Sequence, residues 1–309
     1  MSDLVNLFVA ESGMAHDDVL RIIRSAPQRY KVFSIPKRSG GTREIAQPAR
    51  ELKVLQRVLV DSILCNLPVH SAATAYRKGR SILDNAIPHK GGLPILKLDF
   101  ENFFPSIVAD DWINYCNDHD IFDNNDRLMS AKILFRRAKG ERILKLSIGA
   151  PSSPIVSNIL MFEFDTLVTE SANKRRLNYT RYADDMTFSG QRAGMLKDMV
   201  KEVASAARSV SYPRLNLNRS KTTFVTAATR RSVTGVVLSN DGEVGIGHQR
   251  KRIISAKVHY STQGKLNIDQ LRTLAGELAF INVVEPAFLS WLSAKYGEPA
   301  IEKIKHLEI

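Results

Sequence analysis

Two adjacent aspartates, Asp184 and Asp185, lie inside a stretch whose neighbours favour a buried strand, RYADDMTFSG (181–190). Tyr182 and Phe188, which flank the pair, belong to residue types that are enriched in strands. Neighbouring carboxylates repel each other, and burying one without compensation is costly. Either the pair forms a hairpin turn, where Asp is common, or it holds a divalent cation that offsets the repulsion.

The charge and the cysteine content of the chain narrow its class. The sequence has 44 Lys and Arg against 32 Asp and Glu, a net charge of +12. This excess suits a nucleic-acid partner, although a merely soluble basic protein has the same balance. Cys65 and Cys116 lack metal-type spacing, which argues against a disulfide framework and a Cys-ligated zinc site. With no signal-peptide pattern and no apolar run of membrane-spanning length, we expect a cytoplasmic protein without a membrane partner.

The order of expected elements indicates an α+β fold. A strand is expected over 93–99, a long helix over 153–174, a hairpin around 184–185 and an amphipathic helix after it. This order suits an antiparallel sheet backed by helices. In such a sheet the strand that ends at Asp99 can lie beside the hairpin, so that three carboxylates share one place.

Three carboxylates on neighbouring strands make a hard, oxygen-rich site of the kind that Mg²⁺ prefers. Magnesium keeps several waters and bridges substrate phosphates, and two ions roughly 4 Å apart can clamp the attacking and leaving oxygens. The chemistry expected of such a site is phosphoryl or nucleotidyl transfer. A bound cation would also explain why the repulsion between Asp184 and Asp185 is tolerated.

The motifs usually called A, B and C of reverse transcriptases have similar counterparts here, in the same order: LDFENFFPSI (98–107), GAPSSPIVSN (149–158) and YADD (182–185). IPKRSGGTREIAQP (35–48) and LNLNRSK (215–221) resemble stretches that lie before motif A and after motif C in this family. Each motif alone is a weak signal. Their shared order makes coincidence improbable.

Two further stretches resemble a particular branch of the family. NAIPH (85–89) resembles the NAxxH element, and VTG (233–235) the VTG triplet, that mark bacterial retron reverse transcriptases. The resemblance extends over about residues 30–250, most of the chain. The sequence therefore resembles the retron type of reverse transcriptase.

The resemblance implies an α+β right-hand polymerase fold with fingers, a palm made of an antiparallel sheet backed by helices, and a short helical thumb. We expect an N-terminal helical extension over 1–29, the first part of the fingers over 30–92, the palm with a fingers insertion over 93–245, and the thumb over 246–309.

The resemblance also implies roles for residues around motifs A and C. Asp99, Asp184 and Asp185 match the metal-binding aspartates for two Mg²⁺ ions, with the Phe100 carbonyl as an additional ligand. Lys221 matches the lysine that stabilises or protonates the leaving pyrophosphate. An ordinary surface lysine is the alternative for Lys221.

The nucleotide is expected to meet positive charge and a flat ring. Lys37 and Arg43 match cations of the fingers hairpin, although a solvated charged hairpin is the alternative. Arg38 is an equally charged neighbour, and we rank Arg43 first. Phe104 matches the aromatic beneath the incoming sugar, where a ring excludes a ribose 2′-OH. Plain core packing is the alternative, and the adjacent Phe103 competes for either role.

Motif B is expected to bring backbone close to the nucleotide. Gly149 and Ala150 have almost no side chain, so a base or sugar can approach them. Many relatives have Gln immediately before this Gly, whereas this chain has Ile148. An apolar side chain cannot hydrogen-bond the nucleotide, so contact there must come from packing or backbone.

Three stretches are candidates for RNA contact. NAIPH is assigned by resemblance to family-specific structure or to RNA contact, since a lone His without a His or Cys partner is rarely a metal ligand. VTG is assigned in the same way, with a turn or bulge glycine as the alternative. HQRKRIISAKVHY (248–260) is strongly basic and is expected to carry phosphate contacts on a thumb helix, unless it is a solvated helix face. The candidate residues are Asn85, His89, Val233, Thr234, Gly235, Arg250, Lys251 and Arg252.

By this resemblance the protein would copy a structured non-coding RNA from an internal guanosine 2′-OH. The product would be branched single-stranded DNA joined to RNA, used in anti-phage defence with an effector protein. Two alternatives remain at this stage: another bacterial reverse transcriptase such as a group II intron-like enzyme, and a catalytically silent RNA-binding scaffold. Intact Asp99, Asp184 and Asp185 argue against the scaffold.

Overall fold

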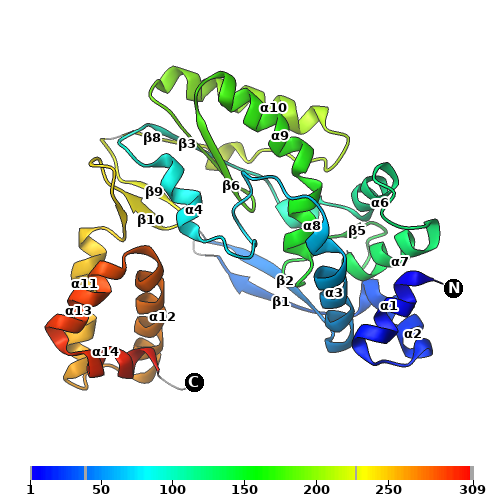
Figure 1. Cartoon of the computed structure of the whole chain (residues 1–309), viewed down its shortest axis with the longest axis horizontal. Helices are drawn as coiled ribbons and strands as arrows, with labels where there is room; N and C mark the ends of the chain where they lie inside the picture. Colours follow the sequence, from blue (N-terminus) through cyan, green and yellow to red (C-terminus); the bar gives the residue numbers. More distant parts are fainter. Residues whose placement is uncertain (1, 38–39, 227, 307–309) are drawn as a thin grey trace.

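The computed structural model describes residues 2–37, 40–226 and 228–306. Figure 1 shows a central sheet with helices above it, helices at the N-terminal end on one side, and a group of C-terminal helices on the other. The N-terminal helices α1 (Asp3–Ser12) and α2 (His16–Ser25) pack with α3 (Arg50–Ser62). The short amphipathic helices that the sequence indicates before residue 30 are thus present.

A two-stranded antiparallel hairpin connects these helices to the middle of the molecule. It consists of β1 (Tyr30–Pro36) and β2 (Thr42–Pro48), with Ile35 opposite Arg43. Its outer half is exposed, including Val32, Phe33 and Ile35 at 44%, 41% and 40%. A hairpin with so little of its own core relies on its neighbours for support.

The central sheet has four antiparallel strands in the order β6-β7-β3-β8. The strands are β3 (Ile95–Asp99), β6 (Asn178–Tyr182), β7 (Asp185–Ser189) and β8 (Thr223–Val225). Helices α9 (Phe162–Lys174) and α10 (Ala193–Ser209) pack together and against the sheet (Figure 1). The expected antiparallel sheet backed by helices is confirmed.

The expected long helix over 153–174 is two helices. The chain forms α8 (Ser153–Leu160) and then α9, separated at Met161. Pro154 occupies the first turn of α8, where its missing N–H costs nothing. Met161 has a ψ angle of 2°, outside the helical range, so the helical backbone is interrupted there.

The remaining elements connect or extend these parts. Three-residue 3₁₀ turns occur at Ala26–Gln28, Leu64–Asn66, Ile87–His89 and Arg219–Lys221. The other helices and strands between the hairpin and the C-terminal helices are α4 (Ile82–Ala86), α5 (Phe103–Ser106), α6 (Ala109–Asp118), α7 (Asn124–Leu134), β4 (Arg136–Arg137), β5 (Leu144–Lys145), β9 (Arg231–Val233), β10 (Val236–Leu238) and β11 (Val244–Gly245).

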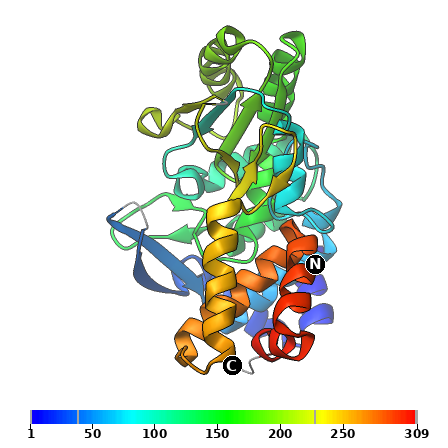
Figure 2. The same cartoon turned by 90° about the vertical axis from the view of Figure 1, so that its left-hand side faces the viewer.

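The C-terminal helices have a hydrophobic core of their own. They are α11 (His248–Thr262), α12 (Ile268–Val284), α13 (Pro286–Tyr296) and α14 (Glu298–Lys305), and Figures 1 and 2 show them as a group below the sheet. Ile254, Leu278 and Leu292 lie in this core, which also takes in Val233 and Ala86. Within the described residues, we find no helix with the length and apolar character needed to cross a membrane.

Candidate active site

The paired aspartates lie at the tip of the hairpin formed by β6 and β7. Asp185 is opposite Tyr182 across the hairpin and opposite Asp99 on β3, so the ends of three strands meet there. Ala183, in the two-residue turn, has a φ of 57°, which costs a residue with a Cβ atom roughly 1–2 kcal/mol. A strained turn of this kind persists only where the surrounding structure stabilises it.

A buried ion pair directly behind the hairpin tip stabilises this turn. Arg181 makes a bidentate contact with Asp165 of α9 at 2.6–3.1 Å, and neither side chain is exposed. Arg181 also donates to the carbonyl of Ala183 at 2.9 Å and to Asn158 at 3.2 Å. The Tyr179 hydroxyl donates to the same Asp165 carboxylate at 2.7 Å. Arg181 therefore positions the turn through the backbone of Ala183.

Asp165 and Arg181 are functional residues that the sequence reasoning did not single out. The available signal was Arg181 itself, a charged residue in a short strand next to buried positions. A fully buried Arg requires an anionic partner. Identifying Asp165 as that partner requires knowing that α9 packs against β6.

Burial, together with repulsion from neighbouring carboxylates, raises the pKa of both paired aspartates. For Asp184, burial is the largest cause and the charge of Asp99 is the next. For Asp185, burial and then the charges of Asp184 and Asp99 raise the pKa to about 6. The site thus concentrates negative charge in a half-buried place, a condition that a bound cation relieves.

Lys221 is the cation that the chain itself supplies. Its Nζ lies 3.1 and 3.0 Å from the two carboxylate oxygens of Asp99, and this hydrogen bond raises the lysine pKa. The Lys221 side chain is 55% exposed, whereas that of Asp99 is 7% exposed. Among the residues that the structure describes, no three His, Cys, Asp or Glu side chains are gathered closely enough to hold a metal ion unaided.

The three carboxylates nevertheless fit a magnesium site. Magnesium is usually bound through one or two carboxylates, with waters and substrate phosphates completing its octahedron, so a complete protein cage is not needed. The raised pKa values of Asp184 and Asp185 show that their negative charge is not fully compensated by the protein. The donor set is also all oxygen, as a hard cation prefers.

The structure separates the two candidate phenylalanines. Phe103 is buried and stacks on Phe100, with ring centroids 5.8 Å apart. Phe104 is only half-buried, and its ring lies 6.4 Å from that of Tyr76. Of the two, Phe104 is therefore the ring that a substrate can reach. Tyr76, which is 52% exposed and also 6.4 Å from Tyr182, was not anticipated from the sequence.

The cations of the β1–β2 hairpin differ in their position. Burial raises the pKa of both Asp184 and Tyr76, and the charge of Arg43 on β2 is close enough to offset a small part of each increase. Lys37 is exposed at the end of the hairpin, where its backbone N–H donates to the Gly41 carbonyl. Arg38 lies outside the described residues. The ranking of Arg43 first thus agrees with its electrostatic reach toward the carboxylates.

Motif B packs against the same hairpin. The Ala46 N–H donates to the Ile148 carbonyl at 2.8 Å. Gly149 has a φ of 114°, and a Cβ atom there would lie 3.1 Å from the Ala46 carbonyl oxygen and from a methyl group of Ile45. Ala150 is buried. The glycine is therefore required by close packing on β2, a need that the sequence interpretation, which considered only the nucleotide, did not foresee.

The NAIPH element is mostly internal. His89 is fully buried, with its ring nitrogens 2.8 Å from the hydroxyl oxygens of Ser189 and Thr180. Burial lowers the pKa of His89 to about 3, so the ring is neutral. Asn85 is also buried, and its carbonyl accepts a hydrogen bond from the Thr180 hydroxyl. These side chains support structure, and the exposed residues of the element are Ile87 and Pro88.

The VTG triplet forms the turn of the β9–β10 hairpin. Val233, which is buried, pairs with Val236, while Thr234 and Gly235 have φ angles of 46° and 83°. The Thr234 hydroxyl donates to the Ile82 carbonyl at 3.3 Å, which ties the turn to the start of α4. Gly235 is thus a turn glycine, and a positive φ is unusual for a β-branched residue such as Thr234.

The basic residues of α11 are used in different ways. Arg250 lies 4.7 Å from the centre of the Phe280 ring on α12. Lys251 forms an ion pair with Glu285. Arg252 is exposed, and no described carboxylate pairs with it. Of these three candidates, only Arg252 offers an uncommitted charge to a phosphate.

Comparisons with known proteins show which enzyme family the chain resembles and which members of that family are similar to it. The family described as reverse transcriptase (RNA-dependent DNA polymerase) matches residues 35–239. The retron Ec83 reverse transcriptase of Escherichia coli is 37% identical over 295 residues, covering 94% of this chain and 95% of the relative. The retron Ec86 enzyme of the same organism is 34% identical, with 92% and 88% covered. The retron Mx162 enzyme of Myxococcus xanthus is 32% identical, with 84% and 58% covered.

Some solved structures are similar to this chain. One is telomerase from Candida albicans in complex with a fragment of telomeric RNA, with a TM-score of 0.48 and 13% identity. That alignment covers 89% of this chain and 60% of the other. A foamy viral protease-reverse transcriptase with double-stranded DNA has a TM-score of 0.46 and 14% identity, with 90% and 44% covered.

The chain belongs to the reverse transcriptases and, within them, to the retron reverse transcriptases. It is an RNA-directed DNA polymerase with an α+β polymerase fold, so the expected family, fold class and enzyme activity are confirmed. Reverse transcriptase domains generally use divalent metal ions, and nucleic acid is their partner. These matches do not favour the group II intron-like alternative.

Proposed function

We propose that this enzyme copies a structured non-coding RNA into branched, RNA-linked single-stranded DNA, starting from an internal guanosine 2′-OH. The product would act in anti-phage defence in the cytoplasm, together with an effector protein. The observation that carries the catalytic part is the meeting of Asp99 and Asp185 across two strands, with Asp184 beside them. The retron relatives support the branched product.

We assign the parts of the polymerase as follows: an N-terminal helical extension over 1–29, fingers from 30–92, a palm with a fingers insertion over 93–245 and a thumb over 246–309. The exposed β1–β2 hairpin suits the fingers, and the four-stranded sheet suits the palm. The separate core of α11–α14 suits a thumb, although this core also includes Val233 and Ala86. The thumb is therefore anchored on the VTG and NAIPH elements.

The metal site consists of Asp99, Asp184, Asp185 and the Phe100 carbonyl, which would together hold two Mg²⁺ ions. Bound Mg²⁺ would supply charge to the substrate phosphates and to the attacking and leaving oxygens. Arg181 holds the Asp184–Asp185 turn in place through the Ala183 carbonyl.

Lys221 has two functions in this proposal. Its ammonium orients the Asp99 carboxylate through both oxygens, at 3.0 and 3.1 Å. Its raised pKa keeps Nζ protonated, and its half-exposed position would let it reach the leaving pyrophosphate and give a proton to it. Both functions need the charge of Lys221 at the same atom.

The nucleotide pocket is formed by residues from three elements. Arg43 and Lys37 of the β1–β2 hairpin would bind the triphosphate, and Arg43 is the stronger candidate because its charge reaches Asp184. Phe104 would pack beneath the deoxyribose. Gly149 and Ala150 would offer backbone to the base while packing on β2.

Thr234, Gly235 and Arg252 are the accessible members of the proposed RNA contacts. Val233, Asn85 and His89 would act by shaping the surface around them, since they are buried. Arg250 and Lys251 would fix α11 for the same purpose.

Expression of the chain with its native upstream region, followed by extraction of bound nucleic acid, tests this function. DNase and RNase should each shorten the recovered species, and debranching enzyme should shift its mobility. The Asp185→Asn variant, processed in parallel, should yield RNA alone. Recovery of linear DNA only, without a 2′,5′ branch under any condition, would contradict the branched product but not the polymerase.

A further inference from the structure

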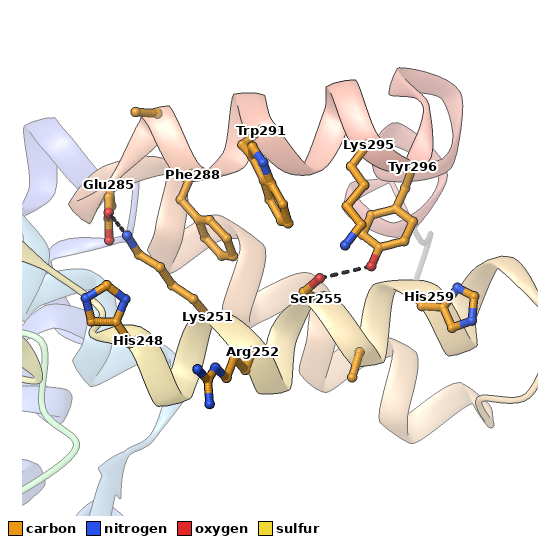
Figure 3. A pocket seen from close by; sticks show the side chains of 12 residues that line it. His248, Lys251, Arg252, Ser255, His259, Glu285, Phe288, Trp291, Lys295 and Tyr296 are labelled. Atoms are coloured by element: carbon orange, nitrogen blue, oxygen red, sulfur yellow. Dashed lines mark hydrogen bonds and ion pairs between the residues drawn. The ribbon is translucent and has the colours of Figure 1, made fainter.

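A groove runs between α11 and α13 on the surface of the C-terminal helices (Figure 3). Its volume is about 750 Å³, and Phe288, Trp291 and Tyr296 reach into it from the α13 side. Trp291 is 47% exposed and lies beside the Phe288 ring, so apolar surface is gathered in the groove rather than scattered. The groove is therefore a candidate binding surface.

The charge around the groove is positive. Its one carboxylate, Glu285, forms an ion pair with Lys251 and accepts a hydrogen bond from the Ile246 N–H. Arg252 and Lys295 line the groove, and no carboxylate among the described residues pairs with either. An occupant with negative charge would therefore be matched, and one with positive charge would be repelled.

The aromatic rings of the groove are already engaged on their faces. The Trp291 and Phe288 rings lie nearly parallel, with centroids 5.6 Å apart. The Lys295 ammonium lies 4.8 Å from the Trp291 centroid and 5.1 Å from that of Tyr296. The Tyr296 hydroxyl is 2.9 Å from that of Ser255. A nucleobase needs a free ring face for stacking, whereas a peptide side chain can pack on ring edges.

The groove also lies away from the polymerase site. Helix α12 is on the side toward the β1–β2 hairpin in Figure 1, and its Phe280 and Val283 line one hollow together with Tyr182 of β6. Helices α11 and α13, which line the groove, lie on the opposite side of this group from the β1–β2 hairpin (Figure 1).

We propose that the α11–α13 groove binds an acidic polypeptide segment of a partner protein, anchored by an aromatic or large aliphatic side chain. The anchor would pack on the exposed edge of Trp291, and the acidic residues would meet Lys295 at the rim. Hot spots of protein interfaces are often aromatic anchors in well-packed pockets, within an interface whose rim is polar. This binding does not depend on the branched product or on DNA synthesis.

Selection from a phage-displayed random peptide library on the full chain, with counter-selection on Trp291→Ala, tests the proposal. Enriched peptides should combine Asp or Glu with one large apolar residue. In fluorescence anisotropy with labelled copies, Trp291→Ala and Lys295→Glu should each weaken binding about tenfold or more. Tyr260→Ala removes a ring of similar exposure, 48%, on α11 but outside the groove, and should leave binding unchanged.

Tryptophan fluorescence gives an independent measurement. The chain has two tryptophans, and Trp112 is fully buried, so acrylamide should quench Trp291 selectively and a bound peptide should protect it. Thermal melting and primer extension of Trp291→Ala and Lys295→Glu should match the wild type. Peptides that lack acidic residues, or that bind both groove variants normally, would overturn the proposal. So would a labelled single-stranded DNA that loses affinity in Trp291→Ala while the peptides do not.

Discussion

Two ion pairs flank the Asp184–Asp185 hairpin. Each joins a cation to an aspartate, but they differ in how deeply they are buried. Behind the tip, Arg181 and Asp165 meet at 2.6 Å with no exposed side-chain surface. In front of it, Lys221 and Asp99 meet at 3.0 Å, with 55% of the lysine side chain in solvent. The first pair is enclosed by α9 and the sheet, whereas the second lies at the open ends of the strands.

Burial decides what each pair can do. Removing one partner of a buried pair leaves an uncompensated charge, which typically costs 3–5 kcal/mol. An exposed pair contributes about 1 kcal/mol or less, so its partners can separate readily. The rear pair therefore fixes the hairpin, while the front pair is free to separate, as the proposed metal binding by Asp99 would require.

The largest stability loss is expected for Arg181→Met. The substitution leaves Asp165 buried without its cation and frees the strained turn at Ala183. We expect the free energy of unfolding to fall by about 3–5 kcal/mol in urea denaturation. The double variant with Asp165→Leu should recover part of this loss, because no charge then remains buried. Equal stability of Arg181→Met and wild type would remove the distinction between the two pairs.

A smaller effect should follow from His89, which is buried between Thr180 and Ser189 on the same two strands. Its pKa falls from 6.5 to about 3 on folding, so the unfolded chain binds the proton first as the pH drops. Stability should therefore decrease as the pH falls from 6.5 toward 3, by about 2 kcal/mol at pH 5 relative to pH 8. His89→Gln should lose this component in urea titrations at the two pH values.

The smallest stability change is expected for Lys221→Ala. The pair is exposed, so the free energy of unfolding should change by less than about 1 kcal/mol. Single-turnover primer extension should nevertheless slow by about 10²-fold, because the proton donor is lost. Lys221→Arg should keep the contact with Asp99 but donate its proton poorly. A normal rate for Lys221→Ala would return this residue to the role of a surface lysine.

The sequence predicts the three aspartates of the site better than the buried ion pair behind them. Local patterns place Asp99, Asp184 and Asp185 at strand ends, because strand alternation and turn chemistry are short-range properties. The contact between Arg181 and Asp165 depends on how α9 packs on the sheet, which no local pattern specifies. The break at Met161 is equally invisible, since helical periodicity continues through it.

The family elements show the same limit. NAIPH and VTG are recognisable as motifs, but the burial of His89 and the turn at Thr234 become apparent only when α4 lies beside the β9–β10 hairpin. The lack of a side chain at Gly149 likewise predicts a close approach by a nucleotide, whereas the structure shows a close approach by β2.

The central claim is that the three clustered carboxylates hold the catalytic metal ions. Manganese binding, followed by electron paramagnetic resonance in the presence of primed template and incoming nucleotide, tests it most directly. Asp185→Asn removes charge without changing shape, so we expect weaker Mn²⁺ binding and loss of primer extension, with an unfolding midpoint at least equal to that of wild type because repulsion from Asp184 and Asp99 is relieved. Wild-type Mn²⁺ affinity and normal extension in a folded Asp185→Asn enzyme would contradict the account.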